Sequence, residues 1–561
     1  MTNIVSTKTA TSKTAGQVIV DILERFGVDR LFCVPGESFL PVLDALQDSA
    51  IDTVLTRHEG GAAMMAEADG KMTKRPGVAL VTRGPGASNA SSGVHVAQQD
   101  STPMVLLVGQ IARDMKGRDA FQEVDYQAFF GGMAKLVIEI DDADQLPALM
   151  VKAWKTAQEG RPGPVVISLP EDMLYDPVHH SSLSPVIIEK PMPDESALDQ
   201  LADMIKAAHS PVIIAGGSCW SDHAITSLET LAITADIPVI CSFRRQRLMN
   251  NLSPAYAGDL GLGCNPAMLT RIKNSDLVIL LGGRMSEIPS QSYSLFDIPH
   301  PQMRFVHIHR DQNELGRVYT PILSIASIED AVIDGLLARM DTVAETPRIN
   351  TAHADFLDWT TPIPEQPGQV NMSKVVAWMR DHLPPESIMT NGAGNYATWL
   401  HRFYYFRDSG SQLAPTSGSM GYGVPAAVAA SLRYPERPVI AFAGDGCFQM
   451  TMPELATAYQ AGAKPIICVI DNGMYGTIRM HQERHFPGRG QLTSLVNPDF
   501  VKLAESMGCI AYYVDHDAAF PDAMTAALTA DRPVLIHIRI DPESITPAMS
   551  LSQITKQAKQ A

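Results

Sequence analysis

The sequence has no long apolar run, no excess of basic charge and no paired-cysteine motif, and each absence excludes a class of protein. No stretch reaches the roughly 18 uncharged apolar residues of a transmembrane helix. The first 16 residues are polar, so we expect neither a secretory signal nor a membrane partner. The formal net charge is −17, from 44 basic and 61 acidic residues, and it disfavours nucleic acid as a partner because phosphates would be repelled.

The seven cysteines are scattered and form no CxxC pair, which indicates free thiols in a reducing compartment, and therefore a cytoplasmic protein. The composition is 45% hydrophobic and 19% charged, typical of a globular protein with substantial cores. A chain of 561 residues exceeds what one core organises, so we expect roughly three or four domains. These properties favour an enzyme that acts on a small molecule.

Three stretches alternate short apolar runs with helical patterns, which is typical of doubly wound α/β domains with mostly parallel sheets. Runs that predict buried strands include VALVTRG (78–84), SDLVILLGGR (275–284) and RPVIAFAGDG (437–446). Polar, Pro-rich segments separate the stretches. We expect one linker to begin at His179-His180, with both side chains solvated, and another to cover 344–356 and 363–370. The predicted domains are 1–182, 192–342 and 368–548.

The strongest chemical pattern consists of two short motifs, each directly after an apolar strand. Gly444-Asp445-Gly446 follows PVIAFA, and Asp471-Asn472-Gly473 follows PIICVI. Glycines let backbone N–H groups approach an anion, while a carboxylate and an amide oxygen are hard ligands for Mg²⁺. A lone GDG triplet is more often a turn. Two such motifs at neighbouring strand ends can together hold a Mg²⁺-diphosphate.

The order strand, GDG, helix, strand, Asn-Gly resembles the signature of thiamine diphosphate (thiamine pyrophosphate) enzymes. The resemblance implies Mg²⁺ ligands from the Asp445 carboxylate, the Asn472 amide and the Met474 backbone carbonyl. It also implies cofactor contacts from residues within the two motifs or directly after them, which are Gly444, Gly446, Cys447, Asn472 and Met474. Relatives commonly have two asparagines where this chain has Asp471-Asn472, and the departure falls on the position that is not a ligand.

A third segment, RHEGGAAMMAEADG (57–70), places Glu59 after an apolar strand and before a Gly/Ala-rich helix. A lone Glu at a helix start is more often there for the macrodipole. The segment, however, closely resembles the glutamate segment of the acetohydroxyacid (acetolactate) synthase family, and TRGPGASNASSG (82–93) resembles the loop that follows it. The resemblance implies that Glu59 is catalytic, as the acid that hydrogen-bonds the cofactor's pyrimidine N1′ and so promotes loss of its C2 proton.

The remaining cofactor contacts are assigned by the same resemblance. In PTSGSMGYGVPAA, Met420 matches the apolar residue over which the cofactor bends, and the carbonyl of Gly418 matches the acceptor for its amino group. Met420 could equally be an ordinary core residue. In NGAGNYATW, Asn395 and Tyr396 match diphosphate-contacting positions where relatives often have Gln and His. In the family, the glutamate and the metal site meet across a subunit interface, which implies a homodimer or a dimer-based homotetramer.

Enzymes of this superfamily decarboxylate a 2-keto acid, and the remaining acyl unit is either protonated to an aldehyde or joined to a second carbonyl. The loop GQIARDMKGRDAFQEVDYQAF (109–129) lacks the paired histidines of simple decarboxylases and resembles the synthase loop. The resemblance implies carboligation, with pyruvate as the expected donor and Gln122 beside the substrate. Lys135 matches a synthase lysine. Taken alone, Gln122 and Lys135 would each be interpreted as surface residues.

Two other functions remain open from the sequence. One is a non-ligating decarboxylase for an aromatic or branched 2-keto acid, which His481 permits because it replaces the tryptophan that shapes the acceptor pocket of the synthases. The other is a silent cofactor-binding subunit, which the joint presence of Glu59, Asp445 and Asn472 disfavours.

Synthases of this family hold FAD in the middle domain, and here the resemblance is partial. Gly283 and Arg284 match, but His309 stands where the synthases have an acid, and Arg244 and Arg245 stand where they have a small apolar turn. A carboxylate at a strand end is the usual partner of a ribose hydroxyl, and histidine adds potential positive charge instead. We predict that FAD is not bound. The middle domain is then structural or uses the three arginines for another anion, unless they are solvated or paired with local acids.

Overall fold

The computed structural model describes residues 12–179 and 182–560 and divides into two compact units. The first unit comprises the chain up to Ile188 apart from Gln99–Ser101, which belong with the second unit from Glu189 onward. Residues 1–11 and His180 lie outside the described residues, so the expectations for the N-terminal segment and for that histidine are not addressed. His179 is exposed, as expected.

The first unit is built on one six-stranded parallel sheet with the strand order β2-β1-β3-β4-β6-β5. Its central strands are buried along their whole length, which explains their continuous apolar runs. Helix α1 begins in a capping box between Thr14 and Gln17 and buries its apolar stripe in the core. The strands are β1 (Arg30–Cys33), β2 (Asp52–Leu55), β3 (Gly77–Val81), β4 (Met104–Gln110), β5 (Leu136–Glu139) and β6 (Pro164–Pro170). The helices are α1 (Ala15–Arg25), α2 (Leu40–Leu46), α3 (Glu59–Thr73), α4 (Pro85–Asp100), α5 (Tyr126–Phe130) and α6 (Leu146–Gln158).

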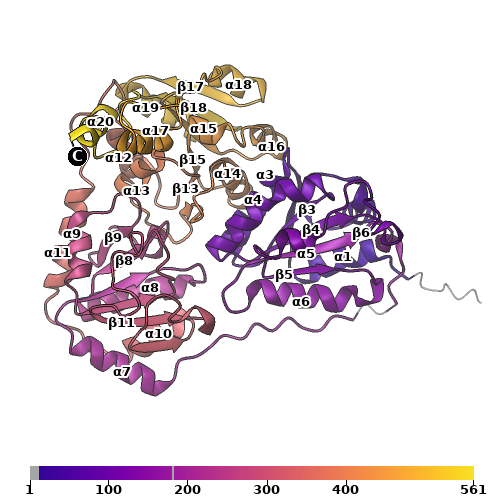
Figure 1. Cartoon of the computed structure of the whole chain (residues 1–561), viewed down its shortest axis with the longest axis horizontal. Coiled ribbons are helices and arrows are strands. Elements are labelled where there is room, and N and C mark those ends of the chain that lie inside the picture. The colour runs from indigo at the N-terminus through magenta and orange to yellow at the C-terminus, as the bar shows by residue number, and fades with distance from the viewer. Residues whose placement is uncertain (1–11, 180–181, 561) are drawn as a thin grey trace, which may run out of the picture. The chain divides into compact units, whose positions relative to one another are not determined.

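The second unit contains two further six-stranded parallel sheets (Figure 1). The middle sheet has the order β12-β11-β10-β7-β8-β9, the strand arrangement of dinucleotide-binding α/β folds. Its strands are β7 (Pro211–Ala215), β8 (Val239–Ser242), β9 (Tyr256–Leu260), β10 (Leu277–Leu281), β11 (Arg304–His309) and β12 (Leu323–Ala326). Its helices are α7 (Glu195–Lys206), α8 (Asp222–Ala235), α9 (Pro266–Lys273), α10 (Glu329–Leu337) and α11 (Pro347–Trp359).

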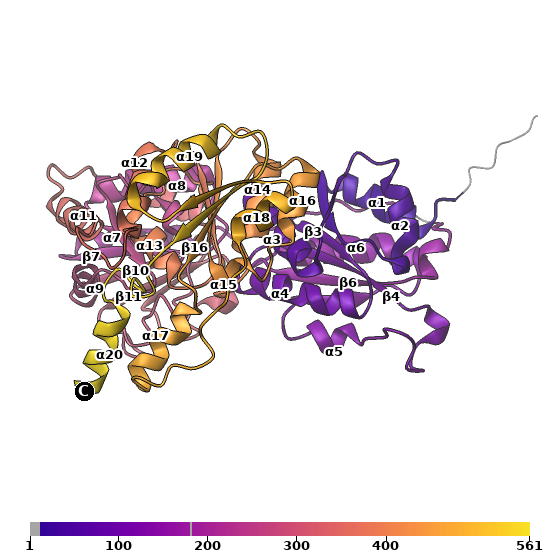
Figure 2. The ribbon, with the colours of Figure 1, turned by 90° about the horizontal axis from the view of Figure 1, so that it is seen from above.

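The C-terminal sheet has the order β14-β13-β15-β16-β18-β17, which repeats the arrangement of the first sheet. Figure 2 shows α12 and α19 together on one face of it, where the rings of Trp378 and Phe520 meet edge to face at 5.7 Å. The strands are β13 (Ile388–Asn391), β14 (Gln412–Leu413), β15 (Val439–Gly444), β16 (Ile466–Asp471), β17 (Ile510–Val514) and β18 (Val534–Arg539). The helices are α12 (Met372–His382), α13 (Tyr396–Phe403), α14 (Gly423–Arg433), α15 (Asp445–Phe448), α16 (Glu454–Ala461), α17 (Gly476–His485), α18 (Phe500–Ser506), α19 (Phe520–Leu528) and α20 (Leu551–Gln560).

The fold confirms three doubly wound α/β sheets and corrects one detail of the chain between them. The segment 344–356, predicted to be a linker, instead forms most of α11. Its Ile349, Ala352 and Phe356 are buried at helical spacing, and the ring of Phe356 packs edge to face on Tyr256 of β9. Polar residues separate those three positions in the sequence, so the segment reads as a polar linker although it is an amphipathic helix.

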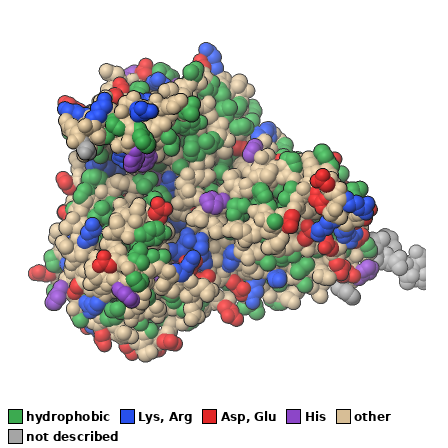
Figure 3. Space-filling model, in the orientation of Figure 1, with side chains coloured by type: hydrophobic (Ala, Val, Ile, Leu, Met, Phe, Trp, Pro, Cys, Tyr) green, Lys and Arg blue, Asp and Glu red, His purple; other side chains and the backbone are tan. Residues whose placement is uncertain are grey.

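The cysteines agree with the prediction of free thiols. All seven cysteines are free. On the face in Figure 3, acidic and basic side chains are interspersed over the described residues. No helix within the described residues is long and apolar enough to cross a membrane.

Candidate active site

The carboxyl ends of β13, β15 and β16 enclose a cavity of about 220 Å³, here called the GDG cavity. Ten residues that the sequence predicts for cofactor or metal binding line it: Asn395, Tyr396, Gly418, Met420, Gly444, Asp445, Gly446, Cys447, Asn472 and Met474. The strand order places the reversal of the C-terminal sheet between β13 and β15, and open α/β sheets form their binding crevice at that point. The fold therefore explains why segments far apart in sequence converge here.

Glycine is required at two positions of this cavity because neighbouring side chains approach the backbone. A Cβ on Gly444 would lie 2.7 Å from the ring of Tyr396, and a Cβ on Gly446 would lie 2.5 Å from the ring of Tyr475. Tyr396 is itself fixed by its hydroxyl, which accepts from the backbone N–H of Gly392 at 3.1 Å. The two rings therefore exclude any side chain larger than hydrogen from this turn, and both glycines line the cavity with their backbone.

Asp445 is a buried carboxylate beside a second carboxylate, Asp471. Burial raises the pKa of Asp445 to about 6, and repulsion from Asp471 adds to the effect. The Asn497 amide bridges the pair, donating to Asp445 Oδ2 at 2.8 Å and to Asp471 Oδ1 at 2.9 Å. A raised pKa means that the ionised form of Asp445 has too little compensating positive charge, which a bound cation would supply.

Asp471 replaces the first asparagine of the family pattern, and its own partners explain how it is tolerated. Burial raises its pKa, but hydrogen bonds from His537, the Gly473 backbone and Arg539 outweigh that effect, so its pKa lies well below the ordinary value. The distances are 2.9 Å to His537 Nε2 and 2.8 Å to Arg539 Nη1. The sequence signal of these partners is the pair of polar residues, His537 and Arg539, in the otherwise apolar strand RPVLIHIRI.

The predicted metal ligands also hold the turn after β16. Asn472 Oδ1 accepts from the backbone N–H of Met474 at 3.2 Å, which orients the side-chain amide toward its own loop. Asn395 also lines the cavity, and its backbone N–H donates to Thr477 Oγ1 at 2.9 Å. Met420 is partly buried and packs against the core of the C-terminal sheet, so it satisfies the ordinary core interpretation while also lining the cavity.

Glu59 and Gln122 belong to the first unit, and both lie beside the turn that follows β3. Glu59 is the first residue of α3, and its Oε2 accepts from the Asn89 side chain at 2.9 Å. Its Oε1 lies 3.3 Å from a Cβ built on Gly86, while the backbone oxygen of Gln122 lies 2.8 Å from a Cβ built on Gly84. The fold thus brings both predicted catalytic residues to one glycine turn.

Gln122 has φ +66°, a left-handed conformation that is uncommon for a non-glycine residue and is often kept where function requires it. Lys135 lies elsewhere, just before β5, where its Nζ donates to the carbonyl of Glu159 at 2.6 Å. The structure therefore separates Lys135 from the edge that carries Glu59 and Gln122.

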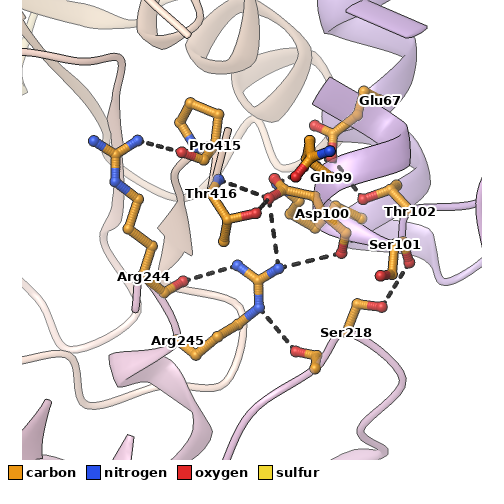
Figure 4. A network of polar contacts seen from close by, with 12 residues as sticks. Glu67, Gln99, Asp100, Ser101, Thr102, Ser218, Arg244, Arg245, Pro415 and Thr416 are labelled. Atoms are coloured by element: carbon orange, nitrogen blue, oxygen red, sulfur yellow. Dashed lines mark hydrogen bonds and ion pairs between the residues drawn. The ribbon is translucent and has the colours of Figure 1, made fainter. Parts of the chain in front are cut away.

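The corresponding edge of the middle sheet is packed. Its strand order reverses between β7 and β10, and there the turns Gly216-Gly217 and Gly282-Gly283 meet: a Cβ on Gly216 would lie 3.0 Å from Gly283 Cα, and one on Gly217 would overlap Gly282 O. The guanidinium of Arg245 fills the adjoining space, donating to the carbonyls of Gly217 at 2.8 Å and Arg244 at 2.9 Å (Figure 4).

Two details of the middle domain differ from the charge expected from the sequence. Burial lowers the pKa of His309, so this histidine is neutral at neutral pH and adds no positive charge. Arg245 is buried against Asp100, whose carboxylate also accepts from the Thr416 backbone at 2.6 Å. Arg284 donates to the carbonyl of Gln99 at 2.6 Å. Arg245 and Arg284 are therefore committed to partners within the protein.

Comparison with known proteins decides the family. Residues 13–129, 198–336 and 392–538 match, in order, the models of the N-terminal, central and C-terminal domains of thiamine pyrophosphate enzymes. The chain is 31% identical over 552 residues to an acetolactate synthase of Mycobacterium bovis, with 95% of this chain and 88% of the relative covered. It belongs to the thiamine pyrophosphate enzyme family.

Further relatives are of the same type. The acetolactate synthase isozyme 2 large subunit of Escherichia coli K12 is 28% identical over 95% of this chain and 96% of its own length. A probable acetolactate synthase large subunit of Methanocaldococcus jannaschii is 30% identical over 95% and 92%. The protein is therefore a thiamine pyrophosphate-dependent enzyme of the acetolactate synthase type. Its GDG cavity, with a bare-backbone turn and an under-compensated buried carboxylate, fits the diphosphate and cation of that cofactor.

Proposed function

We propose that the enzyme decarboxylates pyruvate and joins the remaining acyl unit to the carbonyl of a second 2-keto acid. The observation that carries the proposal is the convergence of ten predicted residues on the GDG cavity, in a chain whose relatives are acetolactate synthases. Thiamine diphosphate, when bound, supplies the carbanion chemistry that removes CO₂. The protein supplies binding, orientation and one proton-transfer group.

Asp445, the Asn472 amide and the Met474 carbonyl would hold Mg²⁺, and Asn395 and Tyr396 would lie beside the diphosphate. Glu59 would hold a proton at the pyrimidine N1′, and its hydrogen bond from Asn89 fixes the carboxyl for that task. Gln122 would orient the substrate from its left-handed turn. We also propose, with the family, a homodimer or dimer-based homotetramer, which light scattering would report as two or four times 60.8 kDa.

A product assay tests the reaction. The purified enzyme is given Mg²⁺, thiamine diphosphate and pyruvate, and the products are identified by mass spectrometry. Acetolactate as the main product supports carboligation. Acetaldehyde without any acyloin would favour the alternative, a non-ligating decarboxylase, and a panel of aromatic and branched 2-keto acids would then identify its substrate.

We propose a weak choice between acceptors because His481 replaces the synthase tryptophan. One methylene is worth only about 1–3 kcal/mol even in a well-shaped apolar pocket. The wild type should therefore use pyruvate and 2-ketobutyrate comparably in competition, and His481→Trp should shift use toward 2-ketobutyrate. A strong wild-type preference for the larger acid would show that other residues shape the acceptor pocket.

We propose further that the middle domain binds no FAD. Support comes from the glycine turns that meet at the sheet reversal and from Arg245, which fills the space beside them. Titration of FAD into the enzyme, followed by flavin fluorescence, should show no saturable quenching. Saturation at one flavin per chain would contradict the proposal.

A further inference from the structure

A second cavity, of about 440 Å³, adjoins the GDG cavity and is here called the arginine cavity. The two share the lining residues Gly394, Asn395 and Thr477. Its volume falls in the range of sites for drug-sized organic molecules. Much of its wall is apolar, formed by Phe243, Leu262, Phe356, Trp359, Met480 and Pro547. The cavity therefore suits the apolar body of an organic ligand.

Arg244 is the charged residue that distinguishes this cavity. Its side chain lines the cavity although the residue is only 4% exposed. One guanidinium nitrogen donates to the carbonyl of Pro415, and Nε is buried without a partner. Among the described residues no carboxylate forms an ion pair with it: Asp100, whose charge acts on Arg244 from a distance, pairs with Arg245 and accepts from Thr416. Figure 4 shows the Arg244 guanidinium directed away from that network.

A buried arginine without a counter-charge is costly, and burial accordingly lowers the pKa of Arg244. The backbone of Arg244 is also left-handed, with φ +56°, which costs free energy for a residue other than glycine. The position of Arg244 thus carries two unfavourable contributions, a buried charge and a strained backbone. Arg244 and His401 both line the arginine cavity, and the positive charge of Arg244 adds to the effect of burial in lowering the pKa of His401. An anion bound there would supply the missing charge.

The other polar groups of the arginine cavity are consistent with an anion. Arg402 lies 3.5 Å above the ring of Trp359 and adds a second positive charge, and Arg484 adds a third at the exposed side. His401 is neutral because burial lowers its pKa to about 3, and its Nε2 is buried without a partner. Asp259 is the one acid among the lining residues, and burial raises its pKa to about 7.

We propose that the arginine cavity binds an organic anion, with its carboxylate on Arg244 and an aromatic or branched apolar body against Phe243, Phe356 and Trp359. The inference rests on the proposed function only in naming the ligand as a 2-keto acid that reaches the GDG cavity. It assigns to this chain an acceptor larger than pyruvate. Of the three arginines noted in the sequence, it selects Arg244 alone.

Binding is tested without turnover. The full-length enzyme is titrated calorimetrically with 3-phenylpropionate and with 3-phenylpropanamide, which has the same shape and no charge. The carboxylate should bind about 10- to 100-fold more tightly than the amide, as expected for a charge-assisted hydrogen bond. Arg244→Gln should remove that difference, and Arg244→Lys should restore part of it. Arg317→Gln, at an exposed arginine of the same domain, should leave it unchanged.

Equal affinity of the acid and the amide in the wild type would overturn the proposal, whatever the variants do. It would also fail if Arg244→Gln remained folded by circular dichroism and kept the full preference for the acid. Because no reaction is followed, the outcome is separate from the product assay. Discrimination between the acid and the amide with no acyloin from pyruvate would contradict the proposed carboligation while supporting this site.

Discussion

The C-terminal and middle sheets of the second unit have comparable doubly wound architecture, yet their carboxyl edges differ. In the C-terminal sheet the turns after β13 and β15 touch through Tyr396 and Cys447, whose hydroxyl and thiol lie 3.1 Å apart, yet with the turn after β16 they enclose the GDG cavity. In the middle sheet the turns after β7 and β10 meet, and Arg245 fills the adjoining space. Strand order therefore determines where a crevice can form, and a few side chains determine whether it remains open.

The largest effect is expected at the open edge. Asp445→Asn replaces the buried carboxylate by a neutral amide, a poorer ligand for a hard cation, so Mg²⁺-dependent activity should fall at least about 100-fold. The test measures turnover as a function of Mg²⁺ concentration. Calorimetry measures the affinity for thiamine diphosphate in parallel. Unchanged Mg²⁺ dependence would show that Asp445 is not a metal ligand. The C-terminal edge would then lack the metal site that is proposed to distinguish it from the middle edge.

Glu59→Gln should separate binding from turnover. The amide keeps the shape of the side chain and can still contact Asn89, but it cannot supply an acid proton to N1′. Turnover should fall by about 10²- to 10⁴-fold, the usual contribution of acid–base catalysis, with cofactor affinity nearly unchanged. Hydrogen–deuterium exchange at C2 of the bound cofactor measures the step directly. Exchange at the wild-type rate in Glu59→Gln would contradict the role of Glu59 as the acid at N1′.

Arg245→Met should show what the packed edge contributes to stability. Losing the guanidinium leaves Asp100 buried with a weaker set of partners, and breaking a buried pair costs about 3–5 kcal/mol. The control Arg317→Met removes an exposed pair, which is worth about 0–1 kcal/mol. Urea denaturation should therefore show a much larger loss in the free energy of unfolding for Arg245→Met than for Arg317→Met. An equal free energy of unfolding for the two variants would show that Arg245 does not stabilise the packed edge.

The smallest effect concerns Asp259, a residue of β9 that lines the arginine cavity. Its folded pKa of about 7 exceeds the ordinary value of 3.8, so the unfolded chain releases this proton first and stability falls as pH rises from about 4 to 7. The nearby Cys241, Tyr256 and Cys264 have raised pKa values and stay neutral in that range. Asp259→Asn should therefore raise the melting temperature by a few degrees at pH 8 and leave it unchanged near pH 4. An equal shift at both pH values would show that the cause is not ionisation.

Much of the fold followed from the sequence because buried parallel strands are written as uninterrupted apolar runs. The residues of the GDG cavity followed because glycine, aspartate and asparagine directly after such runs meet at one edge. Contacts between distant segments had no such signal. Asn497 bridges Asp445 and Asp471 from a loop, and α11 buries three residues hidden among polar ones.

The arginines after β8 show the same limit. Sequence places Arg244 and Arg245 side by side and treats them alike, whereas the fold directs Arg245 to Asp100 and Arg244 to a cavity. Direction of a side chain depends on the backbone, here a left-handed Arg244, and no residue pattern reports it.

The comparison of the two edges is tested most directly by measuring both cofactors at once. The enzyme is equilibrated by dialysis with Mg²⁺, thiamine diphosphate and FAD together, and bound ligand per chain is then quantified by chromatography of the denatured sample. One thiamine diphosphate and no flavin per chain is the predicted result. One flavin per chain, or failure to retain thiamine diphosphate with Mg²⁺ present, would contradict the account.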